Sequence, residues 1–194
     1  MKVLIFLLTL IILSCTLPPI AFNYYCPPVQ QTPRSSEFGF SLSGYFTYNQ
    51  ANRGYFTYFP VWYHKRINEI IDIGARGYFL TTSGALVGPE LAINLKPIKL
   101  ICGFYPFLFI SSDGPGIFPF YYQASIVVGN EKIYFGSIAS PLAFGARAGI
   151  NFPLNNNWEL RSELSYILPP FWINDGSIQG RAVSLGIALA KINR

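Results

Sequence analysis

The sequence predicts an all-β protein, an antiparallel up-and-down transmembrane β-barrel of about ten strands, from three observations. Apolar residues alternate with small or polar ones after residue 36, charged residues keep to one of the two resulting faces, and charged residues are scarce. Alternation at 180° per residue is typical of a strand whose two faces differ. The first such segment puts Phe38, Phe40, Leu42 and Phe46 on one face and Gly39, Ser41, Ser43 and Tyr45 on the other.

Composition favours a membrane protein. Of the 194 residues, 51% are apolar and 12% are charged, whereas an average soluble domain has roughly 25% charged residues. The length suits one domain with a sizeable core, and the shortage of charge is expected for a barrel whose outer band faces lipid. The net charge of +5 comes from scattered Lys and Arg, so no nucleic-acid partner is expected.

Residues 1–14 have the pattern of an export signal. Lys2 supplies the positive start, and the apolar run of residues 3–13 is shorter than the about 20 residues that a membrane-spanning helix needs. Cys15 follows Ile12, Leu13 and Ser14, which resembles a bacterial lipobox, so Cys15 is predicted to be the lipidated first residue of the mature protein. The alternative is that Cys15 simply ends an ordinary signal peptide.

Residues 15–36 are predicted to be an extended tether, and residues 37–194 the barrel domain. The tether contains five prolines, which remove backbone donors and fix φ. Cys102 lies on the predicted lipid face, and Cys26 lies in the tether. With no Cys-x-x-Cys spacing and a single histidine, the sequence predicts no metal site and no cofactor.

Turn residues divide the barrel domain into ten strands. The predicted strands are 37–48, 54–63, 70–80, 85–95, 98–110, 118–128, 132–139, 142–152, 158–168 and 181–191. An even number lets both chain ends lie on one side of the membrane, and the longest connections, 111–117 and 169–180, then fall on the outer side. Eight strands are the alternative, if residues 132–152 form one bent strand or the first hairpin lies outside the wall.

The charged residues test the barrel prediction. When each strand turns its more apolar face outward, every mid-strand charge points inward, as expected if a charge at the bilayer midplane costs about 2–4 kcal/mol. The predicted lumen network consists of Asp72, Arg76, Glu90, Arg147, Glu159, Arg161 and Glu163. Three interpretations stay open: an ion-pair network that plugs the barrel, a polar channel, and a pocket for a fatty chain lined by Tyr105, Phe107 and Phe109.

The sequence predicts no catalytic residue. His64 is the one histidine, and it is expected to be a solvated turn residue beside Lys65 and Arg66. Several aromatic residues near the predicted strand ends fit membrane-interface girdles or simple β-propensity. They are Tyr24, Tyr25, Tyr55, Trp62, Tyr63, Trp158, Tyr166, Phe171 and Trp172.

The lipobox-like ILSC, the Pro-rich tether and the segments GARGYF (74–79) and GARAGINFPLNNNWELRSELSY (145–166) resemble small bacterial outer-membrane β-barrels of the OmpA-like or uncharacterised type. The resemblance covers residues 37–191. It implies a place in the bacterial outer membrane, with outer-membrane lipid and an envelope or surface molecule as partners. The chain ends in Arg194, whereas many such barrels end in an aromatic residue.

The function expected from the sequence is a structural or surface-interaction role without catalysis. One alternative is a narrow pore or a carrier for a small or apolar ligand. The other alternative is a periplasmic lipoprotein with a soluble β-sandwich.

Overall fold

The computed structural model describes residues 21–24, 36–48, 53–81, 84–111, 114–118, 121–169 and 180–193. They form twelve strands: β1 (Ser36–Tyr48), β2 (Arg53–Arg66), β3 (Ile71–Leu80), β4 (Gly84–Leu95), β5 (Ile98–Phe104), β6 (Phe107–Ser111), β7 (Gly114–Phe118), β8 (Tyr122–Gly129), β9 (Ile133–Ser140), β10 (Ala143–Pro153), β11 (Trp158–Leu168) and β12 (Arg181–Asn193). No helix among these residues is long and apolar enough to cross a membrane.

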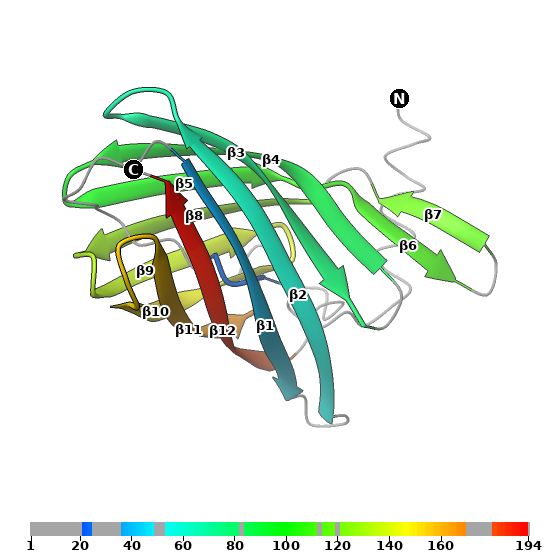
Figure 1. Cartoon of the computed structure of the whole chain (residues 1–194). Helices are drawn as coiled ribbons and strands as arrows, with labels where there is room; N and C mark the ends of the chain where they lie inside the picture. Colours follow the sequence, from blue (N-terminus) through cyan, green and yellow to red (C-terminus); the bar gives the residue numbers. More distant parts are fainter. Residues whose placement is uncertain are drawn as a thin grey trace.

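Ten of the strands close into one barrel (Figure 1). The ring runs β1-β2-β3-β4-β5-β8-β9-β10-β11-β12, every neighbouring pair is antiparallel, and β12 pairs back onto β1 along its whole length. The predicted ten-stranded up-and-down barrel is therefore confirmed. The eight-stranded alternative is wrong because β9 and β10 are separate antiparallel neighbours and the β1–β2 hairpin lies in the wall. The soluble sandwich is wrong because the strands form one closed sheet.

The remaining two strands form a hairpin that extends beyond the wall (Figure 1). The predicted strand 98–110 is interrupted at Tyr105-Pro106, where proline cannot donate to a sheet. Beyond the break, β6 pairs with the start of β4 and with β7. The prediction of an irregular loop over 111–117 is therefore wrong for residues 114–117, because pairing with β6 overrides the local preference of Gly and Pro for turns.

The two ends of the barrel differ. At the end where β1 starts and β12 finishes, short turns join the strands, and we call this the turn end; the opposite end is the loop end. Asn68, Asn130 and Asn155 each begin a turn, and each side-chain oxygen accepts two backbone N–H groups. Such Asx turns reverse the chain locally, which explains why the Asn-containing connections are tight.

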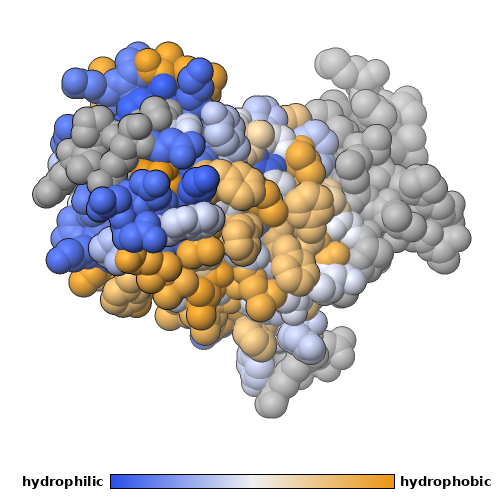
Figure 2. All heavy atoms as spheres, in the orientation of Figure 1, coloured by the Kyte–Doolittle hydropathy of each residue, from blue (hydrophilic) through white to orange (hydrophobic). Residues whose placement is uncertain are grey.

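The outer surface of the wall is apolar. Along β1, the outward side chains Phe38, Phe40, Leu42 and Phe46 are between 44% and 56% exposed, and the side chains between them point inward. Figure 2 shows this apolar surface along the wall, with polar side chains gathered at the turn end. Cys102 is exposed on the same outward face, as predicted. Since large apolar side chains are normally buried, an exterior of this kind is suited to hydrocarbon rather than water.

Small residues make room for large ones inside. A Cβ on Gly39 would lie 2.1 Å from the Trp62 ring, and one on Gly149 would lie 2.0 Å from the Tyr134 ring. In each case the glycine and the aromatic residue are direct partners on neighbouring strands. The interior is thus packed by small–large pairs across strands, as is usual in narrow barrels.

A charge placed on the outer wall tests the membrane position. Ile187, in the middle of β12, is 58% exposed, and Leu154, in a turn at the turn end, is 56% exposed. We expect Ile187→Arg to lower the free energy of unfolding in lipid by about 2–4 kcal/mol and Leu154→Arg by about 0–1 kcal/mol. Denaturant unfolding in liposomes measures both. Equal losses at the two sites would show that the middle of the wall does not lie in hydrocarbon.

Candidate functional site: the barrel lumen

A piece of the predicted tether lies inside the barrel. Residues Ala21, Phe22, Asn23 and Tyr24 are each 0% exposed, and in Figure 1 they form the short blue trace within the wall. We call these four residues the lumen segment. Sequence reasoning missed this placement, because proline-rich flanks indicate an extended chain but do not indicate what that chain contacts.

The wall binds the backbone of the lumen segment. The Gln123 side chain accepts from Phe22 N–H at 2.7 Å and donates to Phe22 C=O at 2.6 Å. The Glu163 carboxylate accepts from Tyr24 N–H at 2.9 Å, and the Tyr58 hydroxyl accepts from Asn23 N–H at 3.2 Å. Because none of the described strands pairs with the segment, these side chains supply hydrogen bonds that its buried backbone groups require.

The side chains of the lumen segment are held as well. Asn23 donates to the Glu163 backbone oxygen at 3.1 Å and accepts a hydrogen bond from the Ser165 hydroxyl. The Phe22 ring stacks on Tyr78 with centroids 4.7 Å apart and meets Tyr58 edge-on at 4.9 Å. Aromatic pairs in these geometries stabilise by about 0.5–1.5 kcal/mol beyond the burial of area.

Tyr24 lies between two buried guanidinium groups. The Cζ atoms of Arg76 and Arg147 each lie 5.1 Å from the Tyr24 ring centroid. Two Nη atoms of Arg76 have no hydrogen-bond partner among the described residues, but the group also lies 5.0 Å from the Trp62 ring. Aromatic faces attract cations strongly once water is excluded, so the rings take over part of the contact that hydrogen bonds would provide.

The lumen segment runs from the loop end toward the middle of the barrel. Ala21 and Phe22 belong to a cluster of apolar and aromatic residues near the loop end, which includes Tyr45, Tyr58 and Tyr78. Tyr24 belongs to a separate cluster deeper in the barrel, with Ala92, Ile101, Val127 and Tyr134. The lumen is therefore aromatic in its loop half and increasingly charged toward the turn end.

The seven residues of the predicted lumen network are all buried, between 0% and 6% exposed. Their ion pairs form four groups. Asp72 meets Lys99 and Arg66, Arg76 meets Glu90, Arg147 meets Glu163, and Arg161 meets Glu159 and Glu37. Every one of these pairs joins a cation to a carboxylate at 2.7 to 3.3 Å, which offsets part of the cost of removing each charge from water.

Glu90 is the centre of the group that contains His64. One Glu90 oxygen accepts from Arg76 Nε at 2.7 Å and from the Tyr105 hydroxyl, and the other contacts His64 Nε2. His64 is 7% exposed, so the prediction of a solvated turn residue is wrong. The physical reason is that β2 continues to Arg66, three residues beyond the predicted strand, and its alternation turns His64 inward.

Glu37 is a second member of the lumen ion-pair groups that sequence reasoning missed. Its carboxylate accepts from Arg161 at 2.7 and 2.8 Å and from the Trp62 indole N–H at 2.7 Å. The signal was present, because Glu37 precedes Phe38 and therefore belongs to the inward phase of the first strand. Among the residues that the structure describes, no three His, Cys, Asp or Glu side chains are placed to hold a metal ion.

The predicted aromatic girdle is only partly correct. Tyr55, Tyr63 and Tyr166 are exposed on the outer wall, but Tyr24 and Trp62 are buried in the lumen. Trp62 points inward because Gly39 lies opposite it and leaves room. Tyr25, Phe171 and Trp172 lie outside the described residues. Tyr105, predicted for an apolar pocket, instead directs its hydroxyl to Glu90.

The decisive observation is the combination of a closed, even-numbered antiparallel barrel, an apolar outer wall and paired charges inside. The chain folds as a small closed β-barrel of the type that crosses a membrane with its strands. The predicted architecture follows from this arrangement.

No protein-family model matches the chain, and no match is found among curated proteins. Among solved structures, the chain is similar to Neisserial surface protein A, with 12% sequence identity and a TM-score of 0.38. That match covers 81% of this chain and 96% of the other. The chain is also similar to Ail, the attachment invasion locus protein of Yersinia pestis, with 9% identity, coverage of 83% and 99%, and a TM-score of 0.39. At these TM-scores, neither barrel indicates what this protein does.

Removing one partner of a buried ion pair tests the lumen groups. Glu163→Gln keeps the shape but leaves Arg147 without its carboxylate, so we expect the free energy of unfolding to fall by about 3–5 kcal/mol. The control Glu69→Gln, in an exposed turn, should change it by less than about 0.5 kcal/mol. Denaturant unfolding in micelles measures both.

The double variant Arg147→Met/Glu163→Leu distinguishes the cost of leaving one charge unpaired from the contribution of the ion pair itself. Because it removes both charges, it should recover most of the stability that Glu163→Gln loses. A double variant as unstable as the single one would mean that Glu163 acts through its contacts with Tyr24 and Tyr134 rather than through the Arg147 charge.

Proposed function

We propose that the protein is a sealed, non-catalytic barrel of the outer membrane with a structural or surface-interaction role. The observation that carries this proposal is burial inside the barrel: the lumen segment is 0% exposed in the loop half, and the ion-pair groups lie buried toward the turn end. A conducting channel needs a continuous water-filled path, and rings and paired charges packed in the lumen favour a sealed barrel over such a path.

The absence of catalysis is supported by the surroundings of His64. Its Nε2 atom contacts Glu90, and the other oxygen of that carboxylate is shared by Arg76 and Tyr105. Catalytic histidines act as a base toward a nucleophile that a substrate can reach. A buried imidazole engaged in an ion-pair group inside a packed lumen fits a structural role better.

The surface role is supported by the β6–β7 hairpin. It extends past the wall at the loop end (Figure 1), and within the described strands β7 pairs only with β6. Ring closure does not require the hairpin, because β5 pairs with β8 below it. A hairpin that the wall does not need is suited to contact an envelope or surface molecule. Lipidation of Cys15, which lies outside the described residues, remains part of the proposal.

Conductance tests the seal. Wild-type protein in planar bilayers should show no stable single-channel current, whereas Phe22→Ala/Tyr24→Ala should conduct, because it removes one ring of the loop-end cluster and the ring that lies between Arg76 and Arg147. Tyr55→Ala, at a tyrosine that is 72% exposed on the outer wall, is the control and should stay closed. Stable current through the wild type would overturn the sealed barrel in favour of the pore alternative.

Epitope insertion tests the orientation and the surface role. A tag inserted between β6 and β7 should be recognised by antibody on intact cells, because long connections of such barrels face outward. A tag in the turn between β10 and β11 should be recognised only after permeabilisation. Heat-modifiable migration in SDS gels should confirm that both variants fold. The reverse pattern would mean that the hairpin faces the periplasm and cannot meet an external partner.

A further inference from the structure

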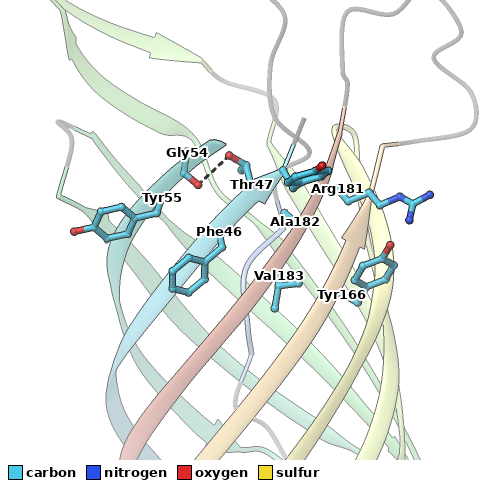
Figure 3. A pocket seen from close by; sticks show the side chains of 9 residues that line it. Phe46, Thr47, Gly54, Tyr55, Tyr166, Arg181, Ala182 and Val183 are labelled. Atoms are coloured by element: carbon cyan, nitrogen blue, oxygen red, sulfur yellow. Dashed lines mark hydrogen bonds between the residues drawn. The ribbon is translucent and has the colours of Figure 1, made fainter. Parts of the chain in front are cut away.

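A hollow of about 680 Å³ opens on the outer wall at the loop end. Strands β1, β2, β11 and β12 form it, and Figure 3 shows the side chains of Phe46, Tyr55, Tyr166 and Val183 on the outside of the barrel. Its lining is mainly aromatic and aliphatic. The Thr47 hydroxyl, which also lines it, donates to the Gly54 backbone oxygen at 3.1 Å. The hollow is therefore an apolar groove with one charged group, Arg181.

Strand register sets the height of each side chain in the groove. Phe46 pairs with Tyr55 on β2 and with Val183 on β12, and Val183 pairs with Tyr166 on β11. These four residues form one row across four strands. Arg181 comes two residues before Val183 and pairs with Tyr48, the last residue of β1. The cation thus lies on the same outward phase as the row but closer to the rim.

The wall below the row is apolar. Leu42, Leu164 and Leu185 lie on the outward phase of β1, β11 and β12 and are 49% to 56% exposed. The groove therefore continues into the lipid-facing surface. Its other end is the aqueous rim. A ligand that fits must have a long apolar part toward the middle of the membrane and a polar part at the rim.

Arg181 differs from the cations of the lumen. Each buried Arg and Lys described above lies against a carboxylate, whereas no carboxylate of the described residues lies within 4.0 Å of Arg181. The other outward cation of β12, Lys191, lies 6.0 Å over the Trp158 ring at the turn end. Arg181 projects outward beside the groove in Figure 3. A guanidinium binds phosphate oxygens through two parallel hydrogen bonds.

We propose that this groove is a binding site for an anionic, phosphate-bearing lipid of the membrane leaflet at the loop end. The phosphate binds Arg181, and an acyl chain packs on the row of Phe46, Val183 and Tyr166. Charge complementarity and continuity with the hydrocarbon-facing wall select a lipid over a soluble ligand. The site goes beyond the proposed function and does not depend on a sealed lumen.

Native mass spectrometry of the full chain in detergent tests the site, with dioleoylphosphatidylglycerol and dioleoylphosphatidylcholine as probes. The wild type should bind the anionic phosphatidylglycerol more tightly than the zwitterionic phosphatidylcholine. Arg181→Gln should weaken binding of the anionic lipid about tenfold, because a charge-assisted contact to phosphate is lost. Lys191→Gln, on the same strand at the opposite rim, should bind as the wild type does. Heat-modifiable migration verifies that each variant is folded.

Three results would overturn the proposal. The first is equal binding of the anionic lipid by the wild type and Arg181→Gln. The second is a loss of binding in Lys191→Gln as large as that in Arg181→Gln. Either result would mean that the groove does not recognise the lipid headgroup. The third is displacement of the lipid by inorganic phosphate alone, which would mean that Arg181 binds phosphate without the acyl chain.

Discussion

Hydrocarbon offers no hydrogen-bond partner to a peptide group, so every strand in the membrane must pair on both edges. The β1–β12 pairing meets this requirement for the whole wall, because it turns an open sheet into a ring. The same hydrocarbon penalises charge on the outer face. Together these constraints explain the alternating burial along each strand, the inward direction of the charged residues and the exposed apolar belt.

Closure creates a second problem, which is the hollow inside. The described residues that point inward pack in two ways. Toward the turn end, carboxylates and cations from different strands pair at 2.7 to 3.3 Å. Toward the loop end, tyrosines surround a segment of the chain that is not part of the wall. The two regions meet at Tyr24, between Arg76 and Arg147.

Many polar groups of the described interior are hydrogen-bonded across distant parts of the sequence, as in the contact between Phe22 and Gln123. By contrast, the outer wall at the loop end combines an apolar groove with Arg181, which has no carboxylate of the described residues within 4.0 Å. The chemistry open to an external ligand lies on the outside of the barrel and at its rim.

Period-two alternation was sufficient to predict ten strands, their order and the inward phase of Arg76, Glu90 and Glu163, because side-chain direction in a strand is a local property. The inward position of His64 was missed only because the predicted strand ends at residue 63, three residues before the end of β2. The β7 strand was missed because its Gly and Pro residues favour turns locally, and only the pairing with β6 makes them a strand.

The sequence by itself thus determined which residues face outward and which face inward. Only the tertiary structure decided which inward residues meet, since pairs such as Arg161 with Glu37 are 124 residues apart and depend on ring closure. The burial of Ala21–Tyr24 was decided in the same way. A short segment without periodicity carries no local signal for its position, and its site exists only after strands from the whole chain have closed around it.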